Sequence, residues 1–554
     1  MIAHNDLLYG TDGIRINIGM GTCGQASGAS SVYDAFINAA SKQGVDAKVV
    51  KVGCIGACFA EPLVEIISYD KPGVLYRNVN PDDSEKILED YLMGKIEEAW
   101  AIREYAGSYR GEHDHPLLYD LPYFKYQVRD AIKNCGIIDP ESIDEYIFFG
   151  GYSALENALK MTQDEVVEEV TKSGLRGRGG AGFNTGLKWR LTRATPSDKK
   201  YIICNAEEGD LGAFMNRINA EGDPHKILEG LIIAGYAIGA NEGIIFVGEE
   251  KHLMGERLQS AVSQAFGHGF LGESILGSGF NFNVRVITCA GAFVCGEETA
   301  LIAAIEGKRG WPTSRPPFPS TRGLYSKPTC INNVETLAHV PKIIAEGSEA
   351  FALVGTDKSK GTKVFCLTGS IKYSGAVEVP LGISLKTLIF DIGGGMRDGH
   401  NFKAVQTGGP SGGCLSKQHL DLPLDYESLQ SAGSIMGSGG VVVMDDTNCI
   451  VDVAKFFLDF ATRESCGQCT PCRIGLRRMH EVLERITSGE GNLNDLELIR
   501  YIGAGVVDSS LCALGRSAPN PVLTSIKYFE DEYLSHINEK YCPAGVCVAL
   551  GGSH

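Results

Sequence analysis

The run Glu464-Ser-Cys-Gly-Gln-Cys-Thr-Pro-Cys-Arg473 places three cysteines at two-residue intervals, and a fourth, Cys512, follows in Ser510-Leu-Cys-Ala-Leu-Gly515. Three thiolates on one loop and a fourth from a distant turn form the four-thiolate shell of a [4Fe–4S] cluster. Four thiolates also suit a closed zinc site, although such sites usually have two separated cysteine pairs. Buried cysteines acting as small hydrophobes fit poorly with the polar neighbours Gln468 and Thr470. The spacing of Cys466, Cys469, Cys472 and Cys512 therefore favours an iron–sulfur cluster and an electron-transfer protein.

The cluster cysteines lie in a helical C-terminal part, because the apolar pattern is helical from Cys449 to about residue 537. His536, Cys542 and Cys547 follow, and together with Cys449 they offer the four nitrogen and sulfur ligands of a zinc site. The other interpretation is a pair of reduced surface cysteines. The sequence leaves both open.

A second distinctive stretch runs from Ser173 to Trp189 and reads SGLRGRGGAGFNTGLKW. It contains a formal G-x-G-x-x-G, but the preceding residues 164–172 predict a helix, whereas a Rossmann fingerprint follows a strand. Consecutive glycines let backbone N–H groups approach an anion, and a helix predicted to begin near Thr185 points its positive end at the same place. The alternative is a glycine-rich structural turn. The flanking Arg176 and Lys188 favour a phosphate-binding loop.

Three further polar runs occur in the same part of the chain, at residues 204–210, 296–300 and 331–336. Each follows an apolar strand-like or turn segment, so we expect each at a strand end, where α/β proteins collect ligands. Their carboxylates and amides suit hydrogen bonds to ribose hydroxyls and to flavin or nicotinamide rings. Glu297 and Glu298 could equally be a helix N-cap and its acidic first turn. Taken with the glycine loop, the runs favour a flavin and dinucleotide site.

Composition fits a multidomain protein of a reducing compartment. The chain has 554 residues, 17 cysteines and a net charge of -17 without a basic block, which argues against nucleic acid as a partner. Residues 1–6 show no start of a signal peptide, and no apolar run is long enough to cross a bilayer. We therefore expect a cytoplasmic protein with no transmembrane segment, whose cysteines bind metal or stay reduced.

The patterning divides the chain into five parts. Residues 1–100 predict a small α/β unit, 101–139 a polar connector and 140–355 a large glycine-rich α/β domain. Residues 356–445 alternate short strands with glycine-rich turns and one helix near 384–391, which predicts a compact β-grasp module. Residues 446–554 form the helical domain.

These motifs resemble those of a known family. The runs SGLRGRGGAGF (173–183), CGEETAL (295–301), INNVET (331–336), GGPSG (408–412) and ESCGQCTPCR (464–473) are similar to the NADH-binding flavoprotein subunits of respiratory complex I and of NAD-linked hydrogenases and formate dehydrogenases. The resemblance covers nearly the whole chain and is greatest to the beta subunits of electron-bifurcating hydrogenases. It implies an α/β multidomain fold with a thioredoxin-like N-terminal domain, a Rossmann-like FMN- and NADH-binding domain, a ubiquitin-like (SLBB) β-grasp module and a helical bundle holding the [4Fe–4S] cluster.

The resemblance also implies roles for individual residues. The flavin site would comprise Gly177, Arg178, Gly179, Gly180, Lys188, Asn205, Glu207, Asn332, Asn333 and Thr336, with Glu208, Phe293 and Gly296 completing the cofactor-binding set. Glu297 and Glu298 would face the NAD(H) ribose and the flavin edge, and Phe183 and Phe318 would stack on the adenine. Asp210 would lie near the nicotinamide and, with Glu298, at the reacting centre. Leu191 stands where relatives often have Phe, so one wall of the adenine site would be missing.

The N-terminal unit resembles a [2Fe–2S] domain that normally has four cysteines. Here Gly53-Cys-Ile-Gly-Ala-Cys58 supplies Cys54 and Cys58, and the first half supplies only Cys23. Either a ligand other than cysteine completes the cluster, or the unit is a docking element without a cofactor.

The implied chemistry is hydride transfer between NADH and FMN, followed by single electrons through iron–sulfur clusters. The implied partners are the other subunits of a hydrogenase-, formate dehydrogenase- or complex I-like assembly, including a small [2Fe–2S] subunit and a ferredoxin-type iron–sulfur subunit. Electron bifurcation in an NAD- and ferredoxin-linked hydrogenase is the favoured setting, and a transhydrogenase is a further one. The competing class is a relay or scaffold subunit whose flavin site has decayed.

Overall fold

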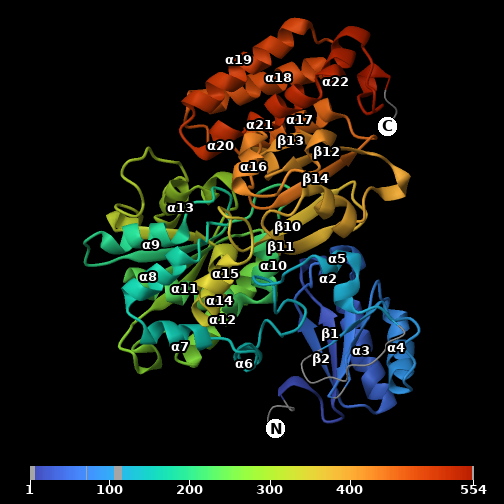
Figure 1. Cartoon of the computed structure of the whole chain (residues 1–554), viewed down its shortest axis with the longest axis vertical. Helices are drawn as coiled ribbons and strands as arrows, with labels where there is room; N and C mark the ends of the chain where they lie inside the picture. Colours follow the sequence, from blue (N-terminus) through green and yellow to red (C-terminus); the bar gives the residue numbers. More distant parts are fainter. Residues whose placement is uncertain (1–6, 70, 105–114, 552–554) are drawn as a thin grey trace.

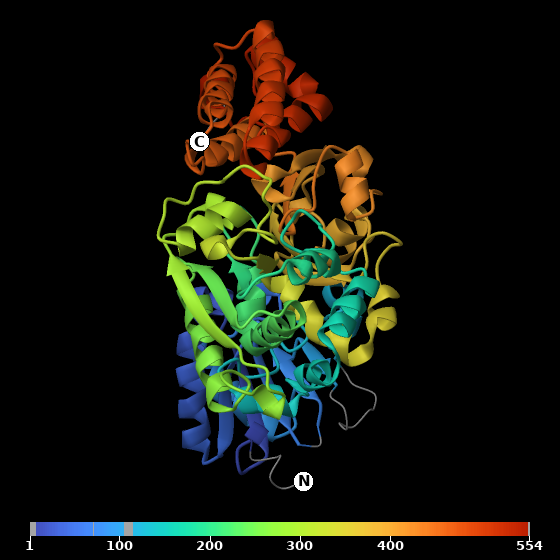
Figure 2. The same ribbon diagram turned by 90° about the vertical axis from the view of Figure 1, so that its left-hand side faces the viewer.

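The computed structural model describes residues 7–69, 71–104 and 115–551 and arranges them in four units, with the third and C-terminal units above the first two in Figure 1. The N-terminal unit and the C-terminal helices lie at opposite ends in both views (Figures 1 and 2). Residues 1–6, on which the signal-peptide expectation rests, and residues 105–114 of the predicted connector lie outside the described ranges. Within those ranges, no helix is long and apolar enough to cross a membrane.

The N-terminal unit is a five-stranded sheet in the order β2-β1-β3-β4-β5. Only the pair β1/β2 is parallel. Its strands are β1 (Ile14–Gly19), β2 (Ala47–Val52), β3 (Val64–Ser68), β4 (Gly73–Tyr76) and β5 (Ala101–Arg103), and its helices are α2 (Thr22–Ala26), α3 (Ala29–Gln43) and α4 (Ser84–Leu92). The buried β5 lies in the stretch predicted as connector, because three residues are too few to show an alternating pattern.

The second unit is built on a four-stranded parallel sheet in the order β8-β7-β6-β9. Its strands are β6 (Tyr201–Ala206), β7 (Glu242–Gly248), β8 (Asn283–Cys289) and β9 (Thr329–Asn333). The helices are α6 (Ile143–Phe148), α7 (Ser153–Lys160), α8 (Gln163–Lys172), α9 (Thr185–Ala194), α10 (Met215–Gly222), α11 (Pro224–Ile238), α12 (His252–Gly267), α13 (Glu298–Ile305), α14 (Val334–Glu346) and α15 (Ser348–Ala352). The central strands β6 and β7 are almost continuously apolar, as expected of strands covered on both faces.

The third unit is a mixed sheet in the order β11-β10-β14-β12-β13, with β10 and β14 parallel. Its strands are β10 (Thr362–Gly369), β11 (Gly375–Pro380), β12 (Phe402–Thr407), β13 (Gly413–Ser416) and β14 (Gly440–Asp445), joined by a short helix α16 (Tyr426–Ser431). The four-residue α5 (Pro122–Lys125) packs beside this unit. The alternation of short strands and turns expected for residues 356–445 is present, and the helix expected near 384–391 corresponds to a helical segment at Thr387–Ile392.

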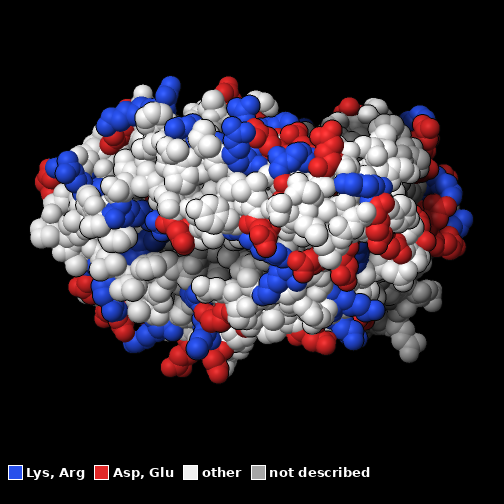
Figure 3. Space-filling model, turned by 90° about the horizontal axis from the view of Figure 1, so that it is seen from above, with Lys and Arg blue, Asp and Glu red and all other residues white. Residues whose placement is uncertain are grey.

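The C-terminal unit consists of helices: α17 (Ile450–Arg463), α18 (Leu476–Thr487), α19 (Leu493–Ser509), α20 (Ala513–Ser517), α21 (Asn520–Tyr528) and α22 (Glu530–Leu534). Its core is continuous with one face of the parallel sheet, since Ile203 and Phe246 belong to the same cluster of buried side chains as Leu476 and Leu483. On the face shown in Figure 3, seen from the top of Figure 1, basic and acidic side chains lie interspersed. That surface therefore carries both signs of charge.

Candidate functional site

The candidate site lies where the strand order of the parallel sheet reverses. From β6 the chain proceeds to β7 and β8 on one side, and then returns to place β9 on the other side of β6. In open parallel sheets, ligands bind beyond the carboxyl ends of the strands at this point. Asn205 of β6 and Asn333 of β9 are register partners there. Asn205 Nδ2 donates to the Gly296 carbonyl (3.0 Å), and Asn333 Nδ2 donates to Asn216 Oδ1 (2.8 Å).

The glycine loop lies against this edge. A Cβ atom added to Gly179 would stand only 3.1 Å from Asn333 Cβ, so the absence of a side chain at residue 179 lets the loop backbone lie directly against the end of β9. Gly180 and Gly182 have positive φ angles of 126° and 62°. On the other side, the Tyr426 hydroxyl of the third unit donates to the Gly177 carbonyl (2.9 Å). Helix α9 then begins at Thr185, which brings its positive end to the loop.

Two residues that were predicted to bind the flavin, Arg178 and Thr336, hold the backbone of the glycine loop in place. The Arg178 side chain is fully buried, and its guanidinium donates to the carbonyls of Arg176 (3.0 Å) and Lys360 (2.6 Å). Its backbone N–H donates to Thr336 Oγ1 (2.8 Å). Both side chains are thus used in shaping the loop. The predicted adenine-contacting rings Phe183 and Phe318 are about half exposed, as is Leu191.

Lys188 connects the loop helix to the acidic pair. Its ammonium donates to Glu298 Oε1 (2.7 Å) and to the Ile331 carbonyl (3.0 Å). Burial raises the pKa of Glu298, but the Lys188 charge outweighs burial and holds the pKa below its usual value. Arg315, which sequence analysis did not single out, also pairs with Glu298 (3.3 Å). Glu298 therefore lies between two cations.

Glu297 takes the helix-cap role that the sequence left open. Its carboxylate accepts from the backbone N–H groups of Thr299 (2.8 Å) and Ala300 (3.0 Å) at the start of α13. It also forms an ion pair with Arg315. The run 296–300 does not directly follow a strand as expected, because a 3-10 turn at Phe293–Gly296 separates it from β8.

The acidic run after β6 contains carboxylates with two different functions. Glu208 accepts from the backbone N–H groups of Asn216 (2.6 Å) and Arg217 (3.0 Å), so it stabilises the start of α10. Glu207 Oε1 and Asp210 Oδ1 are buried, and no described residue donates to either. Burial raises the pKa of Glu207, and it raises the pKa of Asp210 to about 7. A bound flavin or nicotinamide nucleotide has ring N–H and ribose O–H groups, and such donors would satisfy these two oxygens.

Two hydrogen bonds connect the candidate site to the loop that carries Cys466, Cys469 and Cys472. The backbone N–H of Phe293 donates to Glu464 Oε2 (2.8 Å), and Trp311 Nε1 donates to the Cys466 carbonyl (3.1 Å).

A Cβ atom added to Gly296 would stand 2.7 Å from Glu207 Oε2, so Gly296 leaves room for that carboxylate. Asn332 accepts from Trp189 Nε1 (2.8 Å) and is buried behind the strand end.

The four cysteines predicted to hold a cluster come together between α17 and α20. Cys466, Cys469 and Cys472 occupy the loop into α18, Cys512 directly precedes α20, and all four belong to one group of packed side chains. A cluster spreads its thiolates over several irons, so three cysteines from one loop and one from a separate turn fit a [4Fe–4S] cluster.

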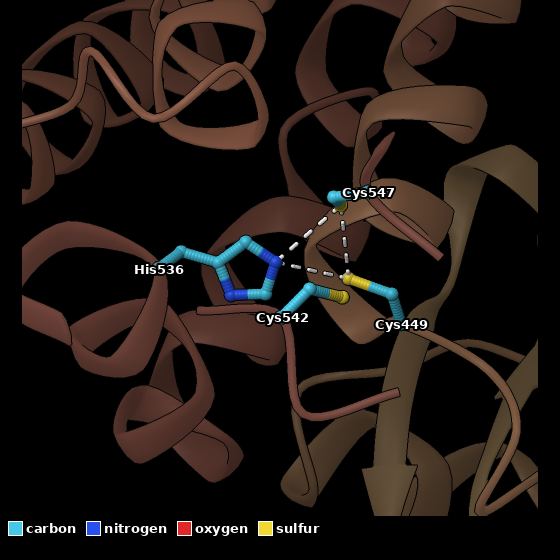
Figure 4. A group of neighbouring side chains, drawn as sticks. All are labelled: Cys449, His536, Cys542 and Cys547. Atoms are coloured by element: carbon cyan, nitrogen blue, oxygen red, sulfur yellow. Dashed lines mark hydrogen bonds between the residues drawn. The ribbon is translucent and has the colours of Figure 1, made fainter. Parts of the chain in front are cut away.

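A second cysteine group is compact and buried (Figure 4). The ligand atoms of Cys449, His536, Cys542 and Cys547 all lie within 4.8 Å of one another. The two sulfurs of Cys449 and Cys547 are 3.8 Å apart, and each is 3.4 Å from His536 Nε2. Tetrahedral zinc with Zn–S of ~2.3 Å and Zn–N of ~2.0 Å implies separations of about 3.8 and 3.5 Å. The interpretation of Cys542 and Cys547 as surface cysteines is wrong, because both are buried.

The histidine of this group is oriented for metal binding. His536 Nδ1 lies 2.8 Å from the Glu532 carbonyl, which can only accept a hydrogen bond, so Nδ1 carries the proton and Nε2 is left facing the sulfurs. Cys449 also caps α17, since its sulfur accepts from the Asp452 backbone N–H (3.4 Å). The donor set, and the carbonyl that fixes the imidazole, fit zinc.

Two family descriptions match the regions that carry these sites. Residues 170–342 match the Nuo51 FMN-binding domain, and residues 452–536 match the NADH-ubiquinone oxidoreductase-F iron-sulfur binding region. The chain is 54% identical over 426 residues to HndC, a subunit of the NADP-reducing hydrogenase of Solidesulfovibrio fructosivorans, covering 77% of this chain and 87% of HndC. It is 45% identical to an NADH-quinone oxidoreductase F subunit of Rhizobium meliloti, covering 74% of this chain and 98% of that protein. The chain belongs to the family of NADH-quinone oxidoreductase F subunits.

Membership confirms the family predicted from the motifs, the FMN-binding domain and the [4Fe–4S]-binding region. The chain is a subunit of the NADH dehydrogenase type. A crystal structure of NAD+-reducing [NiFe]-hydrogenase in the H2-reduced state is similar over 97% of this chain and 88% of its own, with a TM-score of 0.64 and 27% sequence identity. The mixed α/β fold is therefore shared with a solved hydrogenase.

Proposed function

We propose that the carboxyl ends of β6 and β9 bind FMN and that NADH delivers its hydride there, with electrons leaving through the [4Fe–4S] cluster. The observation that carries this proposal is the position of Asn205 and Asn333 beneath the glycine loop, at the switch point of the sheet. The Phe293–Glu464 contact supports a short route onward, because it joins this site to the cysteine loop. When bound, FMN converts the two-electron chemistry of NADH into single-electron transfer.

Different residues of the site would bind the phosphate, the flavin ring and the nicotinamide nucleotide. The backbone of Gly177, Gly179 and Gly180 and the ammonium of Lys188 bind the phosphate, while Asn205, Asn332 and Asn333 position the ring. Glu207, Asp210 and Glu298 face the nucleotide, and Phe183 and Phe318 hold the adenine. Arg178, Glu208, Glu297 and Thr336 act through the backbone that they brace. No side chain needs to transfer a proton in the hydride step.

We assign roles outside the flavin site to the N-terminal unit, the third unit and the C-terminal segment. We propose that the N-terminal unit is a thioredoxin-like [2Fe–2S] domain and that the third unit is a ubiquitin-like SLBB module. Zinc bound by Cys449, His536, Cys542 and Cys547 would fasten the C-terminal segment onto α17. The N-terminal unit and the third unit both lie outside the two matched regions.

The high identity to HndC favours a hydrogenase as the larger assembly. We propose a cytoplasmic, multisubunit, NAD- and ferredoxin-linked hydrogenase in which a small [2Fe–2S] subunit and a ferredoxin-type subunit accept electrons from this chain. Bifurcation predicts that ferredoxin reduction is coupled to a second acceptor or donor. Ferredoxin reduction that proceeds equally well from NADH alone would contradict it. A formate dehydrogenase, a transhydrogenase or a complex I-like enzyme would place the same chain beside other subunits.

The test of the core proposal is reduction of the bound flavin by NADH in the anaerobically purified protein. Stoichiometric bleaching of FMN is expected. Flavin that is absent, or that NADH cannot reduce, would instead identify a relay or scaffold subunit with a decayed flavin site.

A further inference from the structure

The N-terminal unit gathers three thiols that the flavin chemistry does not use. Cys23 lies on α2, directly after β1, whereas Cys54 and Cys58 lie in the loop that follows β2. The three sulfur atoms all lie within 4.8 Å of one another, and Cys54 is buried. A [2Fe–2S] cluster takes four ligands, two for each iron, and histidine replaces cysteine on one iron of Rieske centres. The three thiols are therefore one ligand short of a cluster.

The carboxylate of Glu61 lies beside these thiols. Its Oε1 atom lies 4.0 Å from Cys23 Sγ, and its Oε2 atom accepts from the Leu63 backbone N–H (2.8 Å), which fixes the direction of the side chain. Only 6% of Glu61 is exposed. Within residues 7–69, 71–104 and 115–551, no lysine, arginine or histidine forms an ion pair with it. A buried carboxylate costs free energy unless a cation or a metal compensates it.

Gly19 explains why the carboxylate can reach this position. A Cβ atom added to Gly19, at the end of β1, would stand 2.6 Å from Glu61 Oε2 and 2.8 Å from Oε1. Any side chain at residue 19 would therefore occupy the space that the carboxylate fills. The end of β1 has no ligand side chain of its own, and Glu61 supplies an oxygen in its place.

We propose that Glu61 is the fourth ligand of a [2Fe–2S] cluster held by Cys23, Cys54 and Cys58. The inference rests on the N-terminal cluster of the proposed function and adds the identity of its missing ligand.

The test compares the full chain, purified anaerobically without partner subunits, with the variants Glu61→Gln and Glu61→Cys. The readouts are iron content and the EPR spectrum after reduction, recorded at a temperature where the fast-relaxing [4Fe–4S] signal has broadened away. An amide replaces a charged ligand with a neutral one, so the Gln variant should lose the [2Fe–2S] signal and the two irons of that cluster. The Cys variant should keep the irons and show shifted g values, as expected of an all-thiolate cluster.

A neighbouring carboxylate provides the control. Glu221 is also buried near the thiols, but both of its oxygens accept hydrogen bonds from Thr22, Oε2 from the backbone N–H (2.7 Å) and Oε1 from the hydroxyl (2.5 Å). Glu221→Gln should leave the [2Fe–2S] spectrum unchanged. An unchanged spectrum and iron content in Glu61→Gln, or g values in Glu61→Cys equal to those of the wild type, would overturn the proposal. FMN bleaching by NADH is scored separately, so a wild-type chain with active flavin and no [2Fe–2S] signal would overturn this inference alone.

Discussion

Asn205 and Asn333 are paired across the parallel register of β6 and β9, at the point where the two strands end beneath the glycine loop. Neither amide is free to turn, since Asn205 donates to the Gly296 carbonyl and Asn333 donates to Asn216. A ring placed against this edge would meet two fixed amides, and the positive end of α9 would face its phosphate. This relationship defines the location from which the following predictions are made.

Replacing Lys188 by methionine should weaken FMN binding about tenfold or more, because a hydrogen bond to a charged group contributes ~1.5–3 kcal/mol. The loss would be measured by fluorescence titration of the flavin-depleted protein. Arg190→Met is the matched control, since it removes a positive charge from the same helix where Arg190 pairs with the exposed Glu168. Equal effects of the two substitutions would show that Lys188 acts only through overall charge.

Replacing Asp210 by asparagine should preserve hydride transfer. Asp210 is buried beside the proposed nicotinamide position, but hydride transfer from NADH to FMN needs no proton from a side chain. The expected change is in NADH affinity and flavin potential, measured by stopped-flow flavin bleaching across NADH concentrations. Complete loss of bleaching with both affinities intact would contradict the assigned role.

The same carboxyl should make stability fall as pH rises. Burial raises the pKa of Asp210 from about 4 in the unfolded chain to about 7, so the folded state holds its proton more tightly. Its contribution is fully present below pH 4 and is lost as pH rises through 7, by at most about 1.4 kcal/mol per pH unit. Asp210→Asn should therefore raise the thermal midpoint of the flavin-depleted protein relative to wild type at pH 8. A difference between the two proteins that does not change from pH 4 to pH 8 would disprove this.

Zinc should be present in the purified protein and should depend on Cys547. Elemental analysis is expected to find zinc in the wild type and its loss in Cys547→Ser, together with faster proteolysis of the segment after α22, which the metal would hold. Cys414→Ser is the control, because Cys414 is equally buried but lies outside the group. Zinc retained in the Cys547 variant would rule out this ligand set.

The sequence predicted those features that depend on short spacings. The glycine loop, the Cys466–Cys472 triplet and the helix beginning at Thr185 are each contained within about twenty residues. The expectation that the polar run 204–210 lies at a strand end is also confirmed, since β6 ends within that run. Local periodicity is sufficient for such features, because each is decided by its immediate neighbours along the chain.

Features that depend on strand order and on packing between units could not be predicted. Nothing local indicates that β9 joins β6 on the side opposite β7, and that order alone brings Asn333 to Asn205. Arg315 and Tyr426 contact the site from distant segments and have no motif. Glu61 was missed because a carboxylate three residues after Cys58 resembles an ordinary loop residue until its burial beside Cys23 is known.

The measurement that tests the proposed electron route most directly is an anaerobic NADH titration of the full chain purified without partner subunits, followed by absorbance and EPR. We expect NADH to bleach one FMN per chain and a [4Fe–4S] signal then to develop, which Cys512→Ala abolishes while flavin bleaching persists. A reduced flavin that leaves the wild-type cluster oxidised with any acceptor, or a protein that carries no flavin, would contradict the proposed route from β6 and β9 to the cysteine loop.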